Sequence, residues 1–214
     1  MVQTSRAALC VALMAFLSVM GANAQTPCQS VVGMQNLNAT KLTGVWYESV
    51  RAPAANVGCI EIHIESINND TELAITTWSS SSLSSSYMDQ QQSVVLNTTV
   101  VNANTGFNVT YNTTNAVTTT YKVVGSDNNY ISLCGYTSPD TNTSFGLILT
   151  ASRSPNATWL QGVVNTTSQV LSNFNSTLAV NVPQMNCYAS SASTTLPVLS
   201  SVFATIYLFM KFLN

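Results

Sequence analysis

The feature that most constrains the fold is a series of short segments in which apolar and polar residues alternate. In the clearest of them, residues 59–65, three isoleucines alternate with charged residues and with the one histidine, His63. Period-2 alternation in segments rich in β-branched residues and separated by Asn, Asp, Gly and Ser predicts strands. Eight such segments are expected, at 45–51, 59–65, 71–78, 93–101, 106–111, 117–124, 130–136 and 144–150.

The pattern changes after residue 150. Pro155 follows Ser154, an expected N-cap, and apolar residues then recur at helical spacing up to residue 175, which predicts a helix. A short strand is expected at 177–182. Eight short strands favour an antiparallel barrel or a sandwich. An immunoglobulin sandwich is disfavoured, because Tyr130 lies four residues before Cys134 instead of two, and the tryptophan expected soon after Cys59 is missing.

The two ends of the chain carry its longest apolar runs. Only 7% of residues are charged and the net charge is -2, which argues against a nucleic-acid partner. Arg6, the apolar run 7–20 and the small residues 22–24 predict a secretory signal peptide, with a mature chain from Gln25. The alternative, an uncleaved signal anchor, would need a longer apolar run.

The C-terminal end resembles a signal for a glycosylphosphatidylinositol (GPI) anchor. Small residues at 189–193 precede a polar spacer and an apolar tail, 202–213, which is interrupted only by Lys211. We expect attachment at Ser190; the alternative is a single membrane helix at 196–213. The predicted organisation is therefore a signal peptide (1–24), one domain (25–188) and an attachment signal (189–214).

Four cysteines remain after the signal peptide is removed. An even number in a secreted chain predicts two disulfides, with three possible connectivities, and the absence of C-x-x-C spacing argues against a zinc or redox site. No metal or cofactor is expected. The chain also has nine N-x-[ST] sequons, which are candidate glycosylation sites: Asn38, Asn69, Asn97, Asn108, Asn112, Asn142, Asn156, Asn165 and Asn175.

Three motifs resemble those of the lipocalin family. Residues 41–48, KLTGVWYE, are similar to the G-x-W signature of the first lipocalin strand. Residues 127–130, DNNY, resemble the second motif, T-D-Y, with wider spacing and no threonine, and Arg153 follows the last predicted barrel strand as in the third motif. The three fall in the family's order, and the resemblance is strongest to the branch that contains apolipoprotein D and the GPI-linked insect protein Lazarillo.

The resemblance implies an all-β fold, an eight-stranded antiparallel up-and-down barrel (calyx) with one C-terminal helix. It implies that Gly44, Trp46 and Arg153 close one end of the barrel, with Arg153 laid across the Trp46 ring as a cation–π lid. The family's pairing of first with third and second with fourth cysteine implies the disulfides Cys28–Cys134 and Cys59–Cys187.

An eight-stranded barrel can hold one small ligand, and strand parity predicts which side chains face it. If Asn108 and Asn112 carry glycans, they point outward, and so does Lys122. The expected inward set is Ile62, Ile64, Leu73, Ile75, Phe107, Val109, Tyr111, Tyr121 and Val123. This lining suits a lipophile with one polar end, such as a fatty acid, retinoid, sterol or bilin.

Catalysis is not expected, because general-base or nucleophilic chemistry would need a second group beside His63, and the sequence identifies none. The expected function is ligand binding at the extracellular face of the plasma membrane, through a GPI anchor, or in secreted form. The alternative is a surface glycoprotein for cell recognition or axon guidance, in which the barrel is a scaffold for an extracellular protein partner.

Overall fold

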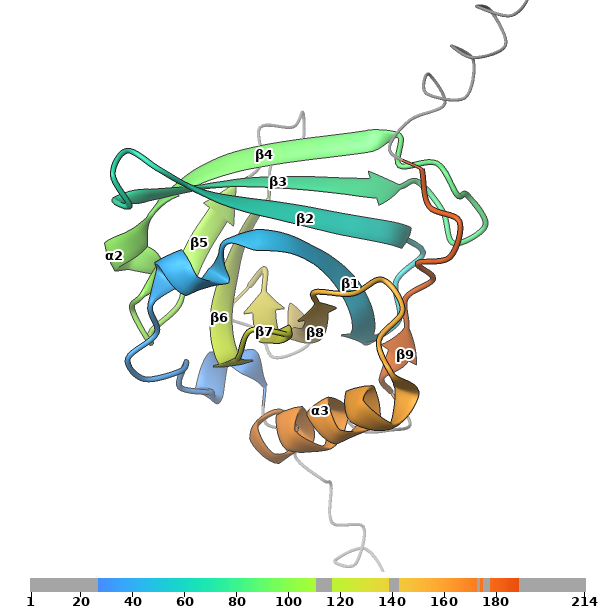
Figure 1. The fold of residues 1–214 in the computed structure, drawn as a ribbon. Helices are drawn as coiled ribbons and strands as arrows, with labels where there is room; N and C mark the ends of the chain where they lie inside the picture. The colour runs from blue at the N-terminus through green and yellow to red at the C-terminus, as the bar shows by residue number, and fades with distance from the viewer. Residues whose placement is uncertain (1–26, 111–116, 139–142, 173, 175–177, 189–214) are drawn as a thin grey trace, which may run out of the picture.

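The computed structural model describes residues 27–110, 117–138, 143–172, 174 and 178–188. Within them, eight antiparallel strands form a nearly closed barrel, and a helix of 14 residues packs against its outside (Figure 1). The expected all-β fold class is therefore confirmed: the alternating segments left a barrel or a sandwich open, and the structure has the barrel that the lipocalin resemblance implies.

The strands lie around the barrel in the order β4-β3-β2-β1-β8-β7-β6-β5, and the described residues form no ladder between β4 and β5. A short ninth strand, β9, pairs with β1 outside this path. The strands are β1 (Gly44–Ala52), β2 (Gly58–Ile67), β3 (Glu72–Ser80), β4 (Gln90–Asn97), β5 (Phe107–Thr110), β6 (Thr118–Ser126), β7 (Tyr130–Tyr136), β8 (Phe145–Thr150) and β9 (Val180–Asn181).

The helical elements differ from the sequence prediction in two places. Residues predicted as the end of the fourth strand form instead the short helix α2 (Thr98–Val101), because the Asn97 side chain accepts a hydrogen bond from the Thr99 amide and caps a helical turn. The long helix α3 (Ala157–Val170) is shorter than predicted, and its N-cap is Asn156 instead of Ser154.

The two ends of the barrel differ. The turn at 68–71, α2 and the 3-10 helix η2 (Ala39–Leu42) lie at one end, where the Ala39 amide donates a hydrogen bond of 2.6 Å to Asn102 Oδ1. We call this the closed end. The loops 53–57 and 81–89 lie at the other, which we call the open end. Figure 1 shows α2 and the loop after β3 at opposite ends of the long strands.

Strands β6 to β8 lie between two apolar clusters, one on each face of the sheet. Leu149, Ile131 and Val123 face the barrel interior, where they join Trp46 and Leu73. The alternate residues face outward and pack under α3 and the segment that follows it; this second cluster contains Ile148, Cys134, Leu171 and Phe174. The period-2 geometry of strands thus builds both clusters from one sheet.

Both chain ends of the domain are fixed to the barrel by disulfides. Cys28 is bonded to Cys134 of β7, and Cys59 of β2 is bonded to Cys187, the pairing that the lipocalin resemblance implies. The N-terminal segment also covers Lys122, whose outward direction was predicted. Its ammonium group is buried and donates hydrogen bonds to the carbonyl oxygens of Cys28, Gln29 and Val31 at 2.7–3.1 Å.

Candidate functional site

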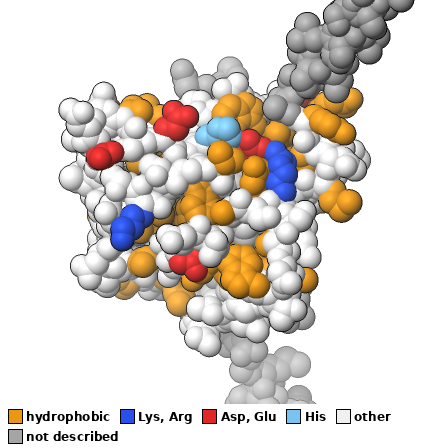
Figure 2. All heavy atoms as spheres, in the orientation of Figure 1, with side chains coloured by type: hydrophobic (Ala, Val, Ile, Leu, Met, Phe, Trp, Pro, Cys, Tyr) orange, Lys and Arg blue, Asp and Glu red, His pale blue; other side chains and the backbone are white. Residues whose placement is uncertain are grey.

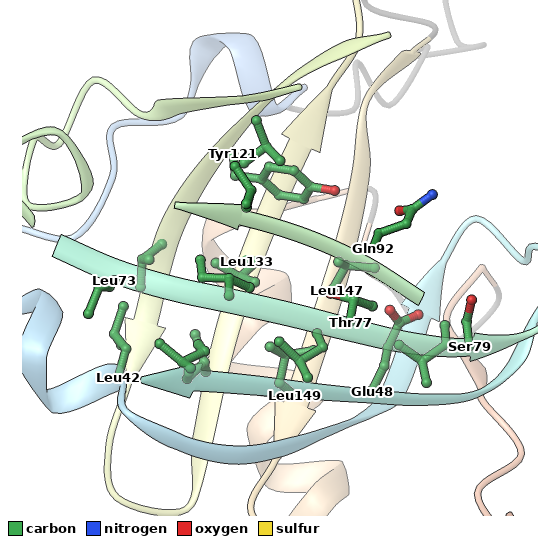
Figure 3. A pocket seen from close by; sticks show the side chains of 18 of the residues that line it. Leu42, Glu48, Leu73, Thr77, Ser79, Gln92, Tyr121, Leu133, Leu147 and Leu149 are labelled. Atoms are coloured by element: carbon green, nitrogen blue, oxygen red, sulfur yellow. The ribbon is translucent and has the colours of Figure 1, made fainter. Parts of the chain in front are cut away.

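The candidate site is a cavity of about 370 Å³ inside the barrel. Its walls come from all eight strands of the barrel, and Figure 3 shows the side chains of opposite strands pointing toward one another across it. A volume of this size lies at the lower end of the range for pockets that hold small organic ligands.

The closed end of the cavity is apolar. Leu42 of η2 and Leu73 of β3 lie there, together at one side of Figure 3, and Val101 of α2 also lines the wall. Trp46 is buried in the same cluster, and its indole N–H donates to the Leu42 carbonyl oxygen at 2.8 Å. A ligand segment at this end would meet hydrocarbon groups, while Trp46 supports the wall from within the buried cluster.

The open half of the cavity carries the polar side chains. Glu48, Thr77, Ser79 and Gln92 lie on the side of Figure 3 away from Leu42 and Leu73. The cavity is therefore amphipathic along the barrel, because its lining changes from apolar at the closed end to polar toward the open end.

The polar half contains an ion pair between the buried Glu48 and the partly exposed Arg51. Arg51 donates from Nε to Glu48 Oε1 at 2.5 Å and from Nη2 to Glu48 Oε2 at 2.9 Å, and the Glu48 side chain is only 2% exposed. Two residues three apart in a regular strand would face opposite sides. Here the β1–β8 register shifts between Glu48 and Val50, and this bulge turns both side chains into the cavity.

The environment of this ion pair shifts the pKa of both Glu48 and Arg51. Burial raises the pKa of the Glu48 carboxyl, and the hydrogen bond and positive charge of Arg51 oppose that shift. Burial would lower the pKa of Arg51, but the hydrogen bond and negative charge of Glu48, together with nearby Tyr121, raise it. The geometry, a bidentate contact, is that of a carboxylate with a guanidinium.

Structural comparison places this architecture among known proteins. No model of a protein family matches the sequence, and no curated protein matches it either. Insecticyanin from the tobacco hornworm Manduca sexta is similar in structure, with a TM-score of 0.56 and 14% identity over 77% of this chain and 90% of that one. The eight-stranded barrel with a C-terminal helix matches that architecture. The chain has the lipocalin fold.

Two further structures agree with this lipocalin architecture at similarly low identity. Apocrustacyanin C1 has a TM-score of 0.52 and 13% identity, over 72% of this chain and 90% of its own. The amine binding protein of Rhodnius prolixus, in its tryptamine complex, has a TM-score of 0.52 and 11% identity, over 81% of this chain and 94% of its own.

The residues predicted to face a ligand are brought together by this lipocalin barrel. Eight of the nine line the cavity; the ninth, Tyr111, lies outside the described residues. Their contact with a ligand stays a prediction. The eight are Ile62, Ile64, Leu73, Ile75, Phe107, Val109, Tyr121 and Val123.

Sequence reasoning missed the polar side of the cavity. Glu48 shares strand parity with Trp46, so alternation alone could have indicated its inward direction. Arg51 could not be found in this way, because its direction depends on the bulge. Gln90 and Gln92 were missed because the fourth strand was predicted to begin at residue 93, whereas β4 begins at Gln90.

The predicted contact between Arg153 and Trp46 is wrong. The Arg153 guanidinium lies 4.4 Å from the centre of the Tyr47 ring and is hydrogen-bonded to Glu61. Trp46 faces the barrel interior, whereas Tyr47 is opposite Glu61 in the β1–β2 ladder, so the outer face of the sheet offers Arg153 both an aromatic ring and a carboxylate. Gly44 has a φ of +138°, which favours glycine at the start of β1.

His63 belongs to the same outer cluster. Its Nε2 lies 2.6 Å from Glu61 Oε1, and its ring centre lies 4.5 Å from that of Trp78. Figure 2 shows the histidine among hydrophobic, acidic and basic side chains on this face. Among the described residues, no group of three His, Cys, Asp or Glu side chains is placed to hold a metal ion.

The six sequons that fall on described residues are all exposed. They are Asn38, Asn69, Asn97, Asn108, Asn156 and Asn165. Asn112, Asn142 and Asn175 lie outside the described residues, as do the expected signal peptide and the expected attachment residue, Ser190. In the part of the chain that the structure describes, no helix is long and apolar enough to cross a membrane.

Proposed function

We propose that this chain is an extracellular, membrane-anchored lipocalin that binds one small lipophile inside its barrel. The observation that carries the proposal is the cavity of about 370 Å³, which has an apolar closed end and a polar open half. The three sequence motifs support a place in the lipocalin family, in the branch that contains apolipoprotein D and Lazarillo.

The lining supports a ligand with a hydrocarbon body and one polar end. Hydrocarbon would fill the space beside Leu42 and Leu73, and the polar end would lie near Glu48 and Arg51. Fatty acids, retinoids, sterols and bilins all have this character. Among the similar structures, the Rhodnius protein forms a complex with tryptamine, which joins a largely apolar ring system to a terminal amino group.

The ion pair favours a polar end that accepts hydrogen bonds. Both oxygens of Glu48 are occupied by Arg51, whereas Nη1 of Arg51 makes no hydrogen bond with the described residues. The pair therefore offers donors to the cavity. A hydroxyl, carbonyl or carboxylate oxygen would complete the hydrogen bonds of Arg51.

The location proposed for the protein rests on several sequence signals. A signal peptide would direct it to the secretory pathway, where disulfides such as Cys28–Cys134 form. Exposed sequons would accept glycans, and the small residues around Ser190 would accept a GPI anchor in the outer leaflet of the plasma membrane.

A ligand titration tests the binding function. The protein, produced in a secretory host and shown to be folded and disulfide-bonded, would be titrated with a fatty acid, retinol, a sterol and a bilin while its tryptophan fluorescence is followed. We expect saturable, one-to-one quenching by at least one of them. If none of them binds, ligand carriage is excluded, and surface recognition by a barrel that serves only as a scaffold becomes the preferred function.

A double variant tests the role of the ion pair. E48Q/R51M removes both charges together, so it leaves no unpaired charge in the cavity. We expect it to weaken binding of a fatty acid and of the matching alcohol by about tenfold, because a hydrogen bond of about 1.4 kcal/mol is lost. Binding of a hydrocarbon without a polar end would be unchanged. Equal losses for all three ligands would contradict a polar-end site.

A further inference from the structure

The C-terminal segment of the domain runs along the open end of the barrel. The Cys59 amide, at the start of β2, donates to the Pro183 carbonyl oxygen at 2.8 Å. The buried side-chain amide of Gln184 donates to the carbonyl oxygens of Glu48 and Ile60 at 2.9 and 3.0 Å. With the Cys59–Cys187 disulfide, these bonds hold the segment in one position.

The last described residue, Tyr188, is fixed to the rim of the barrel. Its amide donates to the Ser86 carbonyl oxygen, and its own carbonyl oxygen accepts from the Met88 amide, both at 2.9 Å. Its ring centre lies 6.1 Å from that of Tyr87. Figure 1 shows this segment beside the loop that joins β3 to β4, at the end opposite α2.

This position limits where an anchor can be. Ser190 follows Tyr188 by two residues, so its Cα lies within roughly 7 Å of the Tyr188 Cα. Attachment at any residue of the small cluster, as far as Ser193, keeps the anchor within roughly 18 Å of Tyr188. The turn at 68–71 lies beyond the whole length of β3, whose nine residues span roughly 30 Å.

The rim near this exit point also exposes large apolar side chains. Leu83 and Tyr87 of the loop at 81–89 are 47% and 44% exposed, and Met185 and Tyr188 of the C-terminal segment are 79% and 46% exposed. Tyrosine is favoured where one end of a side chain meets an apolar medium and the other meets water, as at a membrane surface.

We propose that the open end of the barrel faces the outer leaflet of the membrane that holds the chain, so that the ligand passes between the cavity and that leaflet. The proposal rests on the membrane anchoring and the ligand binding proposed above. The short connection between Tyr188 and the anchor brings the rim to the bilayer, and the apolar rim residues rest against it. The ligand is then a lipophile of the membrane itself.

Contact quenching on the anchored protein tests this orientation. The full chain would be expressed on cells as L83C or, as the matched control, D70C; both positions are exposed, one at the open end and one at the closed end. Each would be labelled with an environment-sensitive fluorophore. A lipid that carries a nitroxide on its headgroup would then be added to the outer leaflet, where it quenches only fluorophores near the membrane surface.

We expect the Leu83 label to lose most of its fluorescence and the Asp70 label to lose little. Equal quenching at both positions, or stronger quenching at Asp70, would overturn the proposed orientation. A phospholipase that cleaves phosphatidylinositol should release both labelled proteins and abolish quenching. If the protein is found only in the medium, the proposed anchoring is wrong, and the proposed orientation is wrong with it. Ligand binding is not affected by that result, because the titration of the released protein tests it separately.

Discussion

The inner and outer faces of one sheet, β6 to β8, are packed in different ways. Outside, beneath α3, Ile148, Leu171 and Phe174 are fully buried, and a Cβ added to Gly146 would lie 2.5 Å from the Phe174 ring. Inside, Leu147 and Leu133 border a cavity of about 370 Å³. The comparison indicates that close packing in the outer layer stabilises the fold, whereas the interior is left incompletely packed and has space of the size of a small ligand.

The largest expected effect on stability comes from truncating a phenylalanine in the outer layer, and the same truncation at the cavity wall is its control. F174A should lower the free energy of unfolding by about 3–5 kcal/mol, because a large side chain is removed from a tightly packed layer. F107A, at the cavity wall, should cost clearly less, since part of the Phe107 ring already faces empty space. Denaturant unfolding measures both, and a greater loss for F107A would refute the distinction.

A buried cation in the outer layer provides the next test. K122M removes the ammonium group that satisfies three carbonyl oxygens of the N-terminal segment, so we expect a loss of about 3 kcal/mol in unfolding free energy. K41M is the control, because Lys41 is exposed. Similar stabilities for the two variants would show that Lys122 does not hold this segment.

Substitutions at two adjacent residues of β8 distinguish an effect on the free energy of unfolding from an effect on ligand affinity. I148F adds volume to the packed outer layer, so it should lower unfolding free energy by about 1–3 kcal/mol and leave ligand affinity unchanged. L147F places the same ring in the cavity, where it should reduce ligand affinity strongly at little cost in stability. Denaturation and fluorescence titration distinguish the two, and the opposite pattern would mean that the cavity is not the binding site.

The smallest expected effect is the pH dependence of the ion pair. The pKa of Glu48 is raised above its ordinary value of 4.5, so the folded protein binds this proton more tightly than the unfolded chain does. The resulting stabilisation is complete below pH 4.5 and is lost as pH rises through the folded-state pKa. The stability of the wild type relative to E48Q should therefore fall as pH rises above 4.5, as measured by denaturation at a series of pH values. If the stability of the wild type relative to E48Q rose with pH instead, Arg51 would lower the pKa of Glu48 by more than burial raises it.

Much of this architecture was predictable because it depends on local patterns. Alternation located all eight barrel strands, and strand parity together with the sequon at Asn108 assigned Phe107 and Val109 to the inside and Asn108 to the outside, as the structure has them. The disulfide pairs followed from the family resemblance. The ends of elements were less predictable: an Asn97 cap ended the fourth strand in a helical turn, because capping competes locally with pairing.

The candidate site was predictable only on its apolar side. Side-chain parity is a local property, so the sequence determined which isoleucines, valines and aromatic residues face the interior. The tertiary structure decided three other features: the β1 bulge that turns Arg51 toward Glu48, the position of Arg153 over Tyr47, and the course of the C-terminal segment to the rim. Each depends on how a strand pairs with partners distant in the chain, and such pairing is fixed by packing across the barrel and not by the order of residues along one strand.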